Sequence, residues 1–156
     1  MGFTLVEMVV TLLIIGILSA VAVPMLGNFF SPSMDASRQS VLAAFRQARF
    51  TAYGHRRLVC VSVAGAFLGQ VQAAANPAAS CTGTTLLSPT GSANFIEGLT
   101  GLTLTSSPSA TLYFQTDGRV TSDLAGAVAT NYTITLAIDG QASTTLMLSG
   151  SSGSAQ

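Results

Sequence analysis

The sequence predicts an α+β fold, in which a long N-terminal helix packs on an antiparallel β-sheet domain. Three patterns support this prediction. Residues 8–30 form 23 consecutive positions without a charge, apolar residues then recur at helical spacing as far as Tyr53, and apolar and polar residues alternate beyond Gly54. After two helical segments, a chain of 156 residues leaves roughly 100 for one compact domain.

The uncharged segment is long enough to cross a membrane. As a helix it spans roughly 34 Å, against a hydrocarbon core of about 30 Å. Glu7 lies in the first turn of this apolar block, where a carboxylate is costly, so we expect it to have a function. A secretory signal peptide would need a basic start, a plain transmembrane anchor leaves Glu7 unexplained, and a buried core helix would need an amphipathic pattern.

A second helix is predicted over residues 31–54. A kink or break near residues 28–33 precedes it, because Pro32 lacks the amide hydrogen of an interior helical residue. Its apolar residues form a stripe that we expect to face a core: Met34, Val41, Phe45, Ala48 and Ala52. Gly54 is expected to cap its C-terminal end.

Alternating residues predict a β domain over residues 55–148. The pattern begins at Val59, Val61 and Val63 and returns near residues 102–104, 112–114, 134–138 and 146–148, with threonines on the outward face. Asp117-Gly118 and Asp139-Gly140 predict tight turns. Residues 73–92 are predicted to be a loop, and residues 149–156 a flexible tail.

Cys60 and Cys81 are the only cysteines in the sequence. In an oxidising compartment they are expected to form a disulfide, and the alternative is one buried and one exposed free thiol. No zinc site is predicted, because the two cysteines have no histidine cluster to complete a set of ligands.

The residue types argue against catalysis. His55 is the single histidine, so no nucleophile–base constellation can be assembled, and no metal or cofactor is expected. Six arginines balance six acidic residues, which argues against a dedicated polyanion binder. Arg56 and Arg57 are candidate DNA contacts, but a solvated surface is the preferred interpretation and nucleic acid is not an expected partner.

The segment Gly2-Phe3-Thr4-Leu5-Val6-Glu7, followed by an apolar run containing Gly16 and Pro24, resembles the N-terminal segment of type IV pilins and type II secretion pseudopilins. The resemblance implies cleavage by prepilin peptidase between Gly2 and Phe3, methylation of Phe3, and packing of residues 3–30 in a filament core. Residues 1–2 would then be a residual leader. The resemblance also implies that Glu7 pairs with the N-terminal amine of a neighbouring subunit, and that Gly16 and Pro24 make the helix flexible.

Residues 41–49, 57–61 and 112–119 resemble the H-type group of pseudopilins and minor pilins. Phe29-Phe30 with the two cysteines is similar to minor pilins of the mannose-sensitive haemagglutinin pilus. The implied function is a non-catalytic minor pilin or pseudopilin of a type IV pilus or type II secretion filament. It would lie in the bacterial inner membrane, with a periplasmic domain, before assembly.

The implied partners are other subunits, the prepilin peptidase, the inner-membrane assembly platform and membrane lipid. Two alternatives stay open at this point. One is a DNA-binding competence minor pilin, and the other is a membrane-anchored periplasmic module without a filament role.

Overall fold

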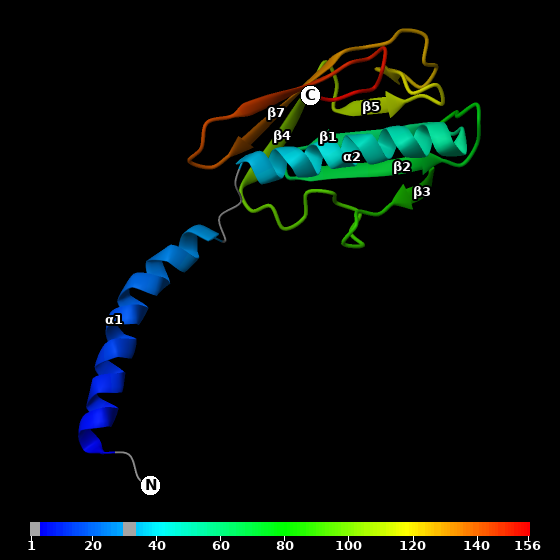
Figure 1. Cartoon of the computed structure of the whole chain (residues 1–156). Coiled ribbons are helices and arrows are strands. Elements are labelled where there is room, and N and C mark those ends of the chain that lie inside the picture. Colours follow the sequence, from blue (N-terminus) through cyan, green and yellow to red (C-terminus); the bar gives the residue numbers. More distant parts are fainter. Residues whose placement is uncertain (1–3, 30–33) are drawn as a thin grey trace. The chain divides into compact units, whose positions relative to one another are not determined.

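The chain divides into two compact units, Met1–Pro32 and Ser33–Gln156. The structure is a computed structural model that describes residues 4–29 and 34–156. Figure 1 shows a single helix in the first unit, and in the second a helix lying against antiparallel strands. The predicted α+β fold class is therefore confirmed.

Helix α1, Leu5–Phe29, makes up the described part of the first unit. It begins at a threonine cap, because the Thr4 hydroxyl accepts a hydrogen bond from the Glu7 amide at 3.3 Å. None of the helices within the described residues is long and apolar enough to cross a membrane. The predicted crossing by residues 3–30 stays a prediction, and the predicted kink includes residues 30–33, which lie outside the described ranges.

Helix α2, Met34–His55, packs on the strands through the predicted apolar stripe. Val41, Phe45, Ala48 and Ala52 are fully buried, and Met34 packs at the margin of the same core. The ring of Phe45 stacks on that of Phe114, with their centroids 6.3 Å apart. This contact joins the middle of the helix to the sheet.

The strands form two antiparallel sheets. The five-stranded sheet has the order β3-β2-β1-β5-β6, and the three-stranded sheet has the order β4-β7-β8. Reciprocal backbone hydrogen bonds between Gly65 and Leu104 connect the two sheets. The strand bounds are Val59–Ala64 (β1), Phe67–Ala73 (β2), Gly83–Leu86 (β3), Leu102–Ser107 (β4), Thr111–Phe114 (β5), Val120–Thr121 (β6), Tyr132–Ile138 (β7) and Thr144–Leu148 (β8).

The predicted alternation sets which side chains reach the core. Val59, Val61 and Val63 of β1 belong to the main core with α2. Tyr132 of β7 is also buried, and its hydroxyl lies 3.3 Å from the carbonyl oxygens of Thr111 and Thr121. Burial raises the pKa of Tyr132, so the neutral phenol is the form that suits the folded state.

The predicted disulfide between Cys60 and Cys81 is confirmed. It ties β1 to the segment between β2 and β3. Cys60 lies among a second, smaller group of apolar residues, distinct from the core beneath α2: Leu58, Ala73, Ala78, Cys81, Tyr113 and Leu124. The disulfide thus holds together a minor core that contains few large side chains.

Two expectations about irregular segments were wrong. The predicted loop at residues 73–92 contains β3, which pairs with β2 from Gln70 to Ala73. Gly83 makes this pairing possible, because a Cβ there would collide with the Gln72 carbonyl. A further strand, β2, was also missed, since its buried face includes Gly69 and the polar Gln70.

The predicted flexible tail at residues 149–156 is folded back onto the domain. Gln156 and Met147 exchange backbone hydrogen bonds of 3.0 and 3.1 Å, and the Gly150 carbonyl accepts one from the Val120 amide at 2.8 Å. The Asn131 side chain accepts a bond from the Gly150 amide. The Gly/Ser-rich composition suggested a flexible tail. The segment is ordered mainly by hydrogen bonds between backbone groups, which composition does not reveal.

We predict that replacing both Cys60 and Cys81 with alanine lowers the free energy of unfolding of residues 33–156 by about 3 kcal/mol, because the open chain gains the entropy of a loop of 21 residues. Urea denaturation measures the change. The wild-type domain with its disulfide reduced is the control and should unfold like the double variant. Equal stability of the double variant and the oxidised wild type would contradict the prediction.

Candidate assembly site

The N-terminal segment presents a carboxylate one turn into α1. Glu7 occupies the third helical position after the Thr4 cap, in a Thr-x-x-Glu pattern. Its carboxylate has no hydrogen-bond or ion-pair partner within residues 4–29 and 34–156. The predicted processing residues Gly2 and Phe3 lie outside the described residues. Gly16 and Pro24 both lie within α1, and the flexibility expected of them stays a prediction.

The first half of α1 is apolar on every side and has no core of its own. Its large side chains are exposed by 50% or more, from Leu5 at 80% to Ile14 at 50%. Burying such side chains is worth about 1.5–3 kcal/mol each. An exposed set of this size therefore requires an apolar partner, either lipid or other protein.

Arg56 and Arg57, the candidate DNA contacts, directly follow the C-terminal end of α2. The helix includes Gly54 and continues to His55, so the expected glycine cap was placed too early. Arg56 itself adopts the left-handed conformation, with φ of 51°. The Arg57 amide donates a hydrogen bond to the Ala52 carbonyl, and the Arg56 amide donates one to the Tyr53 carbonyl. This pair of hydrogen bonds is a Schellman motif.

The side chains of Arg57 and Asn76 bind backbone carbonyls at this helix end. The Arg57 guanidinium donates to the carbonyls of Ala73 and Ala74, and the Asn76 amide donates to the Arg56 carbonyl at 2.9 Å. These bonds connect the α2–β1 corner to the segment that the disulfide also holds. Arg57 therefore serves the fold, and DNA contact by Arg56 and Arg57 stays a prediction.

The exposed side of α2 carries large aromatic side chains among arginines. Phe50 is 75% exposed and Tyr53 is 67% exposed. We call this surface the aromatic–arginine face, and it consists of Arg46, Arg49, Phe50, Tyr53 and Arg56. Two hollows, of about 370 and 450 Å³, lie between it and the β5–β6 turn, and both are lined by Tyr53 and Asp117.

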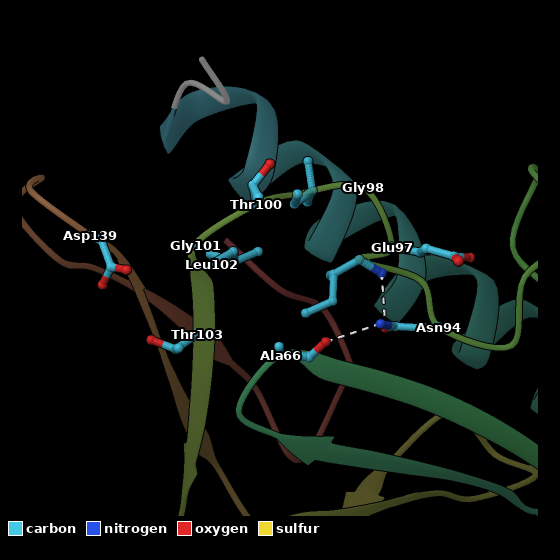
Figure 2. Close-up of a pocket in the computed structure, with 11 residues that line it drawn as sticks. Ala66, Asn94, Glu97, Gly98, Thr100, Gly101, Leu102, Thr103 and Asp139 are labelled. Atoms are coloured by element: carbon cyan, nitrogen blue, oxygen red, sulfur yellow. Dashed lines mark hydrogen bonds between the residues drawn. The ribbon is translucent and has the colours of Figure 1, made fainter. Parts of the chain in front are cut away.

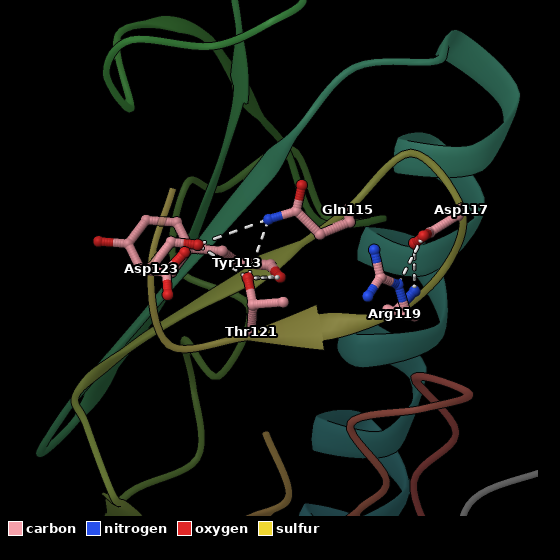
Figure 3. A network of polar contacts seen from close by, with 6 residues as sticks. All are labelled: Tyr113, Gln115, Asp117, Arg119, Thr121 and Asp123. Carbon is pink, nitrogen blue, oxygen red and sulfur yellow. Dashed lines mark hydrogen bonds and ion pairs between the residues drawn. The ribbon is translucent and has the colours of Figure 1, made fainter. Parts of the chain in front are cut away.

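The β5–β6 turn is held rigidly beside this face (Figure 3). Arg119 donates to Asp117 through its side chain at 2.6 Å and its amide at 3.0 Å. Partial burial alone would raise the pKa of Asp117, but the two bonds from Arg119 outweigh that effect and leave it below the usual range. Nearby, the Gln115 side chain donates to the Thr121 hydroxyl at 2.9 Å, which fixes the base of the hairpin.

A separate hollow of about 390 Å³ has acidic residues as its only charged lining residues (Figure 2). Glu97 and Asp139 line it, together with Thr100 and neighbouring loop residues, and no arginine is among its lining residues. Asn94 shapes the loop, because its side chain donates to the Ala66 carbonyl at 3.0 Å and accepts from the Leu68 amide. We call this surface the acidic hollow.

The described residues contain no group of three or more acidic, histidine or cysteine side chains arranged to hold a metal ion.

Residues 2–23 match the family model described as the prokaryotic N-terminal methylation motif. The fold resembles that of the type IV minor pilin FimU of Pseudomonas aeruginosa strain PAO1 in two crystal forms. One match has a TM-score of 0.54 at 18% identity and covers 79% of this chain and 86% of FimU.

The second FimU crystal form gives a TM-score of 0.53 at 18% identity, over 79% of this chain and 90% of that one. No curated protein matches the sequence. The N-terminal segment thus carries the methylation motif, and the fold is similar to that of a type IV minor pilin. Similarity to the H-type group or to the mannose-sensitive haemagglutinin pilus stays a prediction.

The N-terminal methylation motif overlaps the exposed first part of α1, in the segment where the sequence predicted it. The aromatic–arginine face was missed, although a signal for it existed. Phe50 and Tyr53 lie off the apolar stripe of α2, and a large aromatic residue on the outward side of an amphipathic helix has no core to enter. Such exposed residues are available for contact with another molecule.

We predict that Arg56→Gly raises the free energy of unfolding by about 1 kcal/mol, because glycine adopts a positive φ without the Cβ clash that arginine carries. Thermal or urea denaturation of residues 33–156 measures the gain. Arg56→Ala is the matched control, since it removes the same charge but keeps the Cβ, and it should give no gain. If both variants stabilise the domain equally, charge rather than backbone conformation is responsible.

Proposed function

We propose that this chain is a non-catalytic minor subunit of a type IV pilus or type II secretion filament, and that it assembles through its N-terminal helix. The methylation-motif match at residues 2–23 is the observation that carries the proposal. It overlaps the part of α1 whose apolar side chains lack a partner. The single histidine of the sequence also favours a structural over a catalytic role.

In this proposal, residues 3–30 hold the subunit in the bacterial inner membrane before assembly, with the β domain in the periplasm. A prepilin peptidase cuts between Gly2 and Phe3, and the new N-terminus is methylated. The assembly platform then moves the helix from lipid into a filament core of other subunits. Both surroundings are apolar, so the side chains of α1 stay out of water throughout.

Glu7 has a specific part in this transfer. A lone carboxylate in an apolar filament core is costly, and pairing with a cation compensates for that cost. The N-terminal amine of Phe3 in a neighbouring subunit supplies the cation. Because Thr4 already caps the helix, the Glu7 carboxylate is not needed for that purpose.

We expect the chain, expressed behind a short basic leader with a prepilin peptidase, to be cut after Gly2 and methylated on Phe3. Gly2→Val should block the cut, because a branched side chain at the scissile position does not fit where glycine does. Intact mass and N-terminal peptide analysis report both results. Gly16→Val is the matched control and should be processed normally. Trimming near Ala20, or retention of Gly2 beside an active peptidase, would contradict the proposed function.

We also expect Glu7→Leu to be processed but to enter filaments poorly, since the neighbouring amine then lacks its partner. Sheared filaments probed with an antibody to the β domain measure incorporation. Thr4→Ala is the control, because it removes the cap, worth about 1 kcal/mol, and leaves the carboxylate in place. Equal loss in both variants would show that Glu7 acts only through the helix end.

A further inference from the structure

We propose that the aromatic–arginine face binds the surface of an anionic lipid bilayer. The proposal rests on the proposed function, because this bilayer is the membrane that holds residues 3–30 before assembly. It goes further by giving the unit Ser33–Gln156 a contact of its own with lipid headgroups. Every residue of the face belongs to that unit, so the contact does not depend on the placement of α1.

The residues of the face follow one side of a helix. Its members on α2 recur at three- and four-residue steps, which places them next to one another on the solvent side: Arg46, Arg49, Phe50 and Tyr53. The opposite side of α2 is the buried stripe that packs on the sheets. Aromatic rings among cationic side chains, on one surface, are typical of proteins that rest on a membrane interface.

The two aromatic rings suit the headgroup region of a bilayer. Phe50 is 75% exposed, and its ring can leave water there without burying an unpaired polar group. Tyr53 is 67% exposed, and in the same region its hydroxyl stays among polar groups. Arg49 and Arg56 each line one of the two hollows beside Tyr53, where a guanidinium group can bind the phosphate of a lipid headgroup.

The charge of the face is complementary to an anionic surface. Residues 36–96 contain five of the six arginines and no acidic residue. Asp117, which lines both hollows, is already paired with Arg119 at 2.6 Å (Figure 3). Three exposed arginines of the face have no hydrogen-bond or ion-pair partner for their guanidinium groups among the described residues: Arg46, Arg49 and Arg56. Each arginine near an anionic membrane raises binding about fivefold, so three raise it about a hundredfold.

An anionic lipid surface fits the chain better than a nucleic acid does. The net charge of the chain is zero, whereas a protein that binds nucleic acid from solution needs many cationic side chains. Lipid requires fewer, because α1 precedes α2 in the sequence and exposes apolar side chains that themselves need an apolar partner. A chain anchored through α1 presents the face to the bilayer at high effective concentration, so a weak contact becomes well populated.

The full chain reconstituted in lipid vesicles tests this contact. The sequence contains no tryptophan, so Phe50→Trp introduces a single fluorophore into the face. We expect its emission to shift to shorter wavelength, and acrylamide to quench it less, in vesicles that contain phosphatidylglycerol than in vesicles of phosphatidylcholine alone. High salt should reverse both changes, because it screens the charges.

Met147→Trp is the matched control for the fluorophore. Met147 is 63% exposed on β8, between Leu146 and Leu148 of the core, so its side chain lies on the side of the sheet that faces away from the core. Its emission should be the same in both kinds of vesicle. A shift equal to that of Phe50→Trp would show that the domain binds lipid without preference for the face, and would overturn the proposal.

Further substitutions in the Phe50→Trp chain test the arginines. Arg46→Gln should lower the ratio of bound to free face about fivefold, and Arg46→Gln together with Arg56→Gln about twenty-five-fold. Thr145→Glu, an exposed position on β8, lowers the net charge of the chain as much as Arg46→Gln does and should have no effect. Equal losses in the Arg46→Gln and Thr145→Glu variants would assign the response to net charge and contradict the proposal.

Flotation of the chain with phosphatidylcholine vesicles measures anchoring by α1 separately, because this lipid lacks the net charge that the face binds. Flotation with equal emission in both kinds of vesicle rejects the contact and leaves the proposed function standing. Flotation only with phosphatidylglycerol vesicles, with shifted emission, supports the contact and contradicts anchoring by α1. Flotation with neither rejects both. Emission that shifts with an added single-stranded oligonucleotide, but not with phosphatidylglycerol, assigns the face to nucleic acid and overturns the proposal.

Discussion

The unit Ser33–Gln156 depends on the burial of one stripe of α2 against both sheets. Phe45 and Phe114 meet at its centre, and the buried Gln70 side chain donates to the Ala44 carbonyl at 2.8 Å. A helix of this length in water is marginal without tertiary packing. The sheets in turn have a common face to cover, since Gly65 and Leu104 join them at one point. Helix and sheets therefore stabilise one another, and the outward side of α2 is free for other contacts.

The periodic parts of the fold could be predicted from sequence, and the aperiodic parts could not. The apolar residues from Val41 to Ala52 identified α2, because their spacing places them on one face of a helix. The valines of β1 identified a strand, because they occur at every second position. Strand β3 could not be predicted, because it consists mostly of small and polar residues without an apolar alternation. Its pairing depends instead on the close backbone approach at Gly83. The folding of residues 149–156 onto the domain could not be predicted either, because most of its hydrogen bonds join backbone groups, which the sequence does not distinguish.

In the candidate site, too, some residues could be identified from the sequence and others could not. Glu7 could be identified because a carboxylate in an apolar run is anomalous in any structure. The roles of Arg56 and Arg57 could not, since they depend on the conformation at the end of α2 and on carbonyls of Ala73 and Ala74, 16 and 17 positions from Arg57. The sequence favoured Gly54 as the left-handed residue because glycine usually takes that conformation, and here an arginine takes it instead.

The folded C-terminal segment affects how closely copies of this domain can be packed together. Unpaired strand edges are templates for unwanted β-pairing between molecules. Residues 155–156 cover the outer edge of β8, and bonds to Gly150 and Ala129 occupy that of β6. The bridge from Gly65 partly occupies β4. Among the described strands this leaves β3, only four residues long, and the remainder of β4 as open edges. A domain closed in this way can be packed at high local concentration with little risk of fusing its sheets to those of its neighbours.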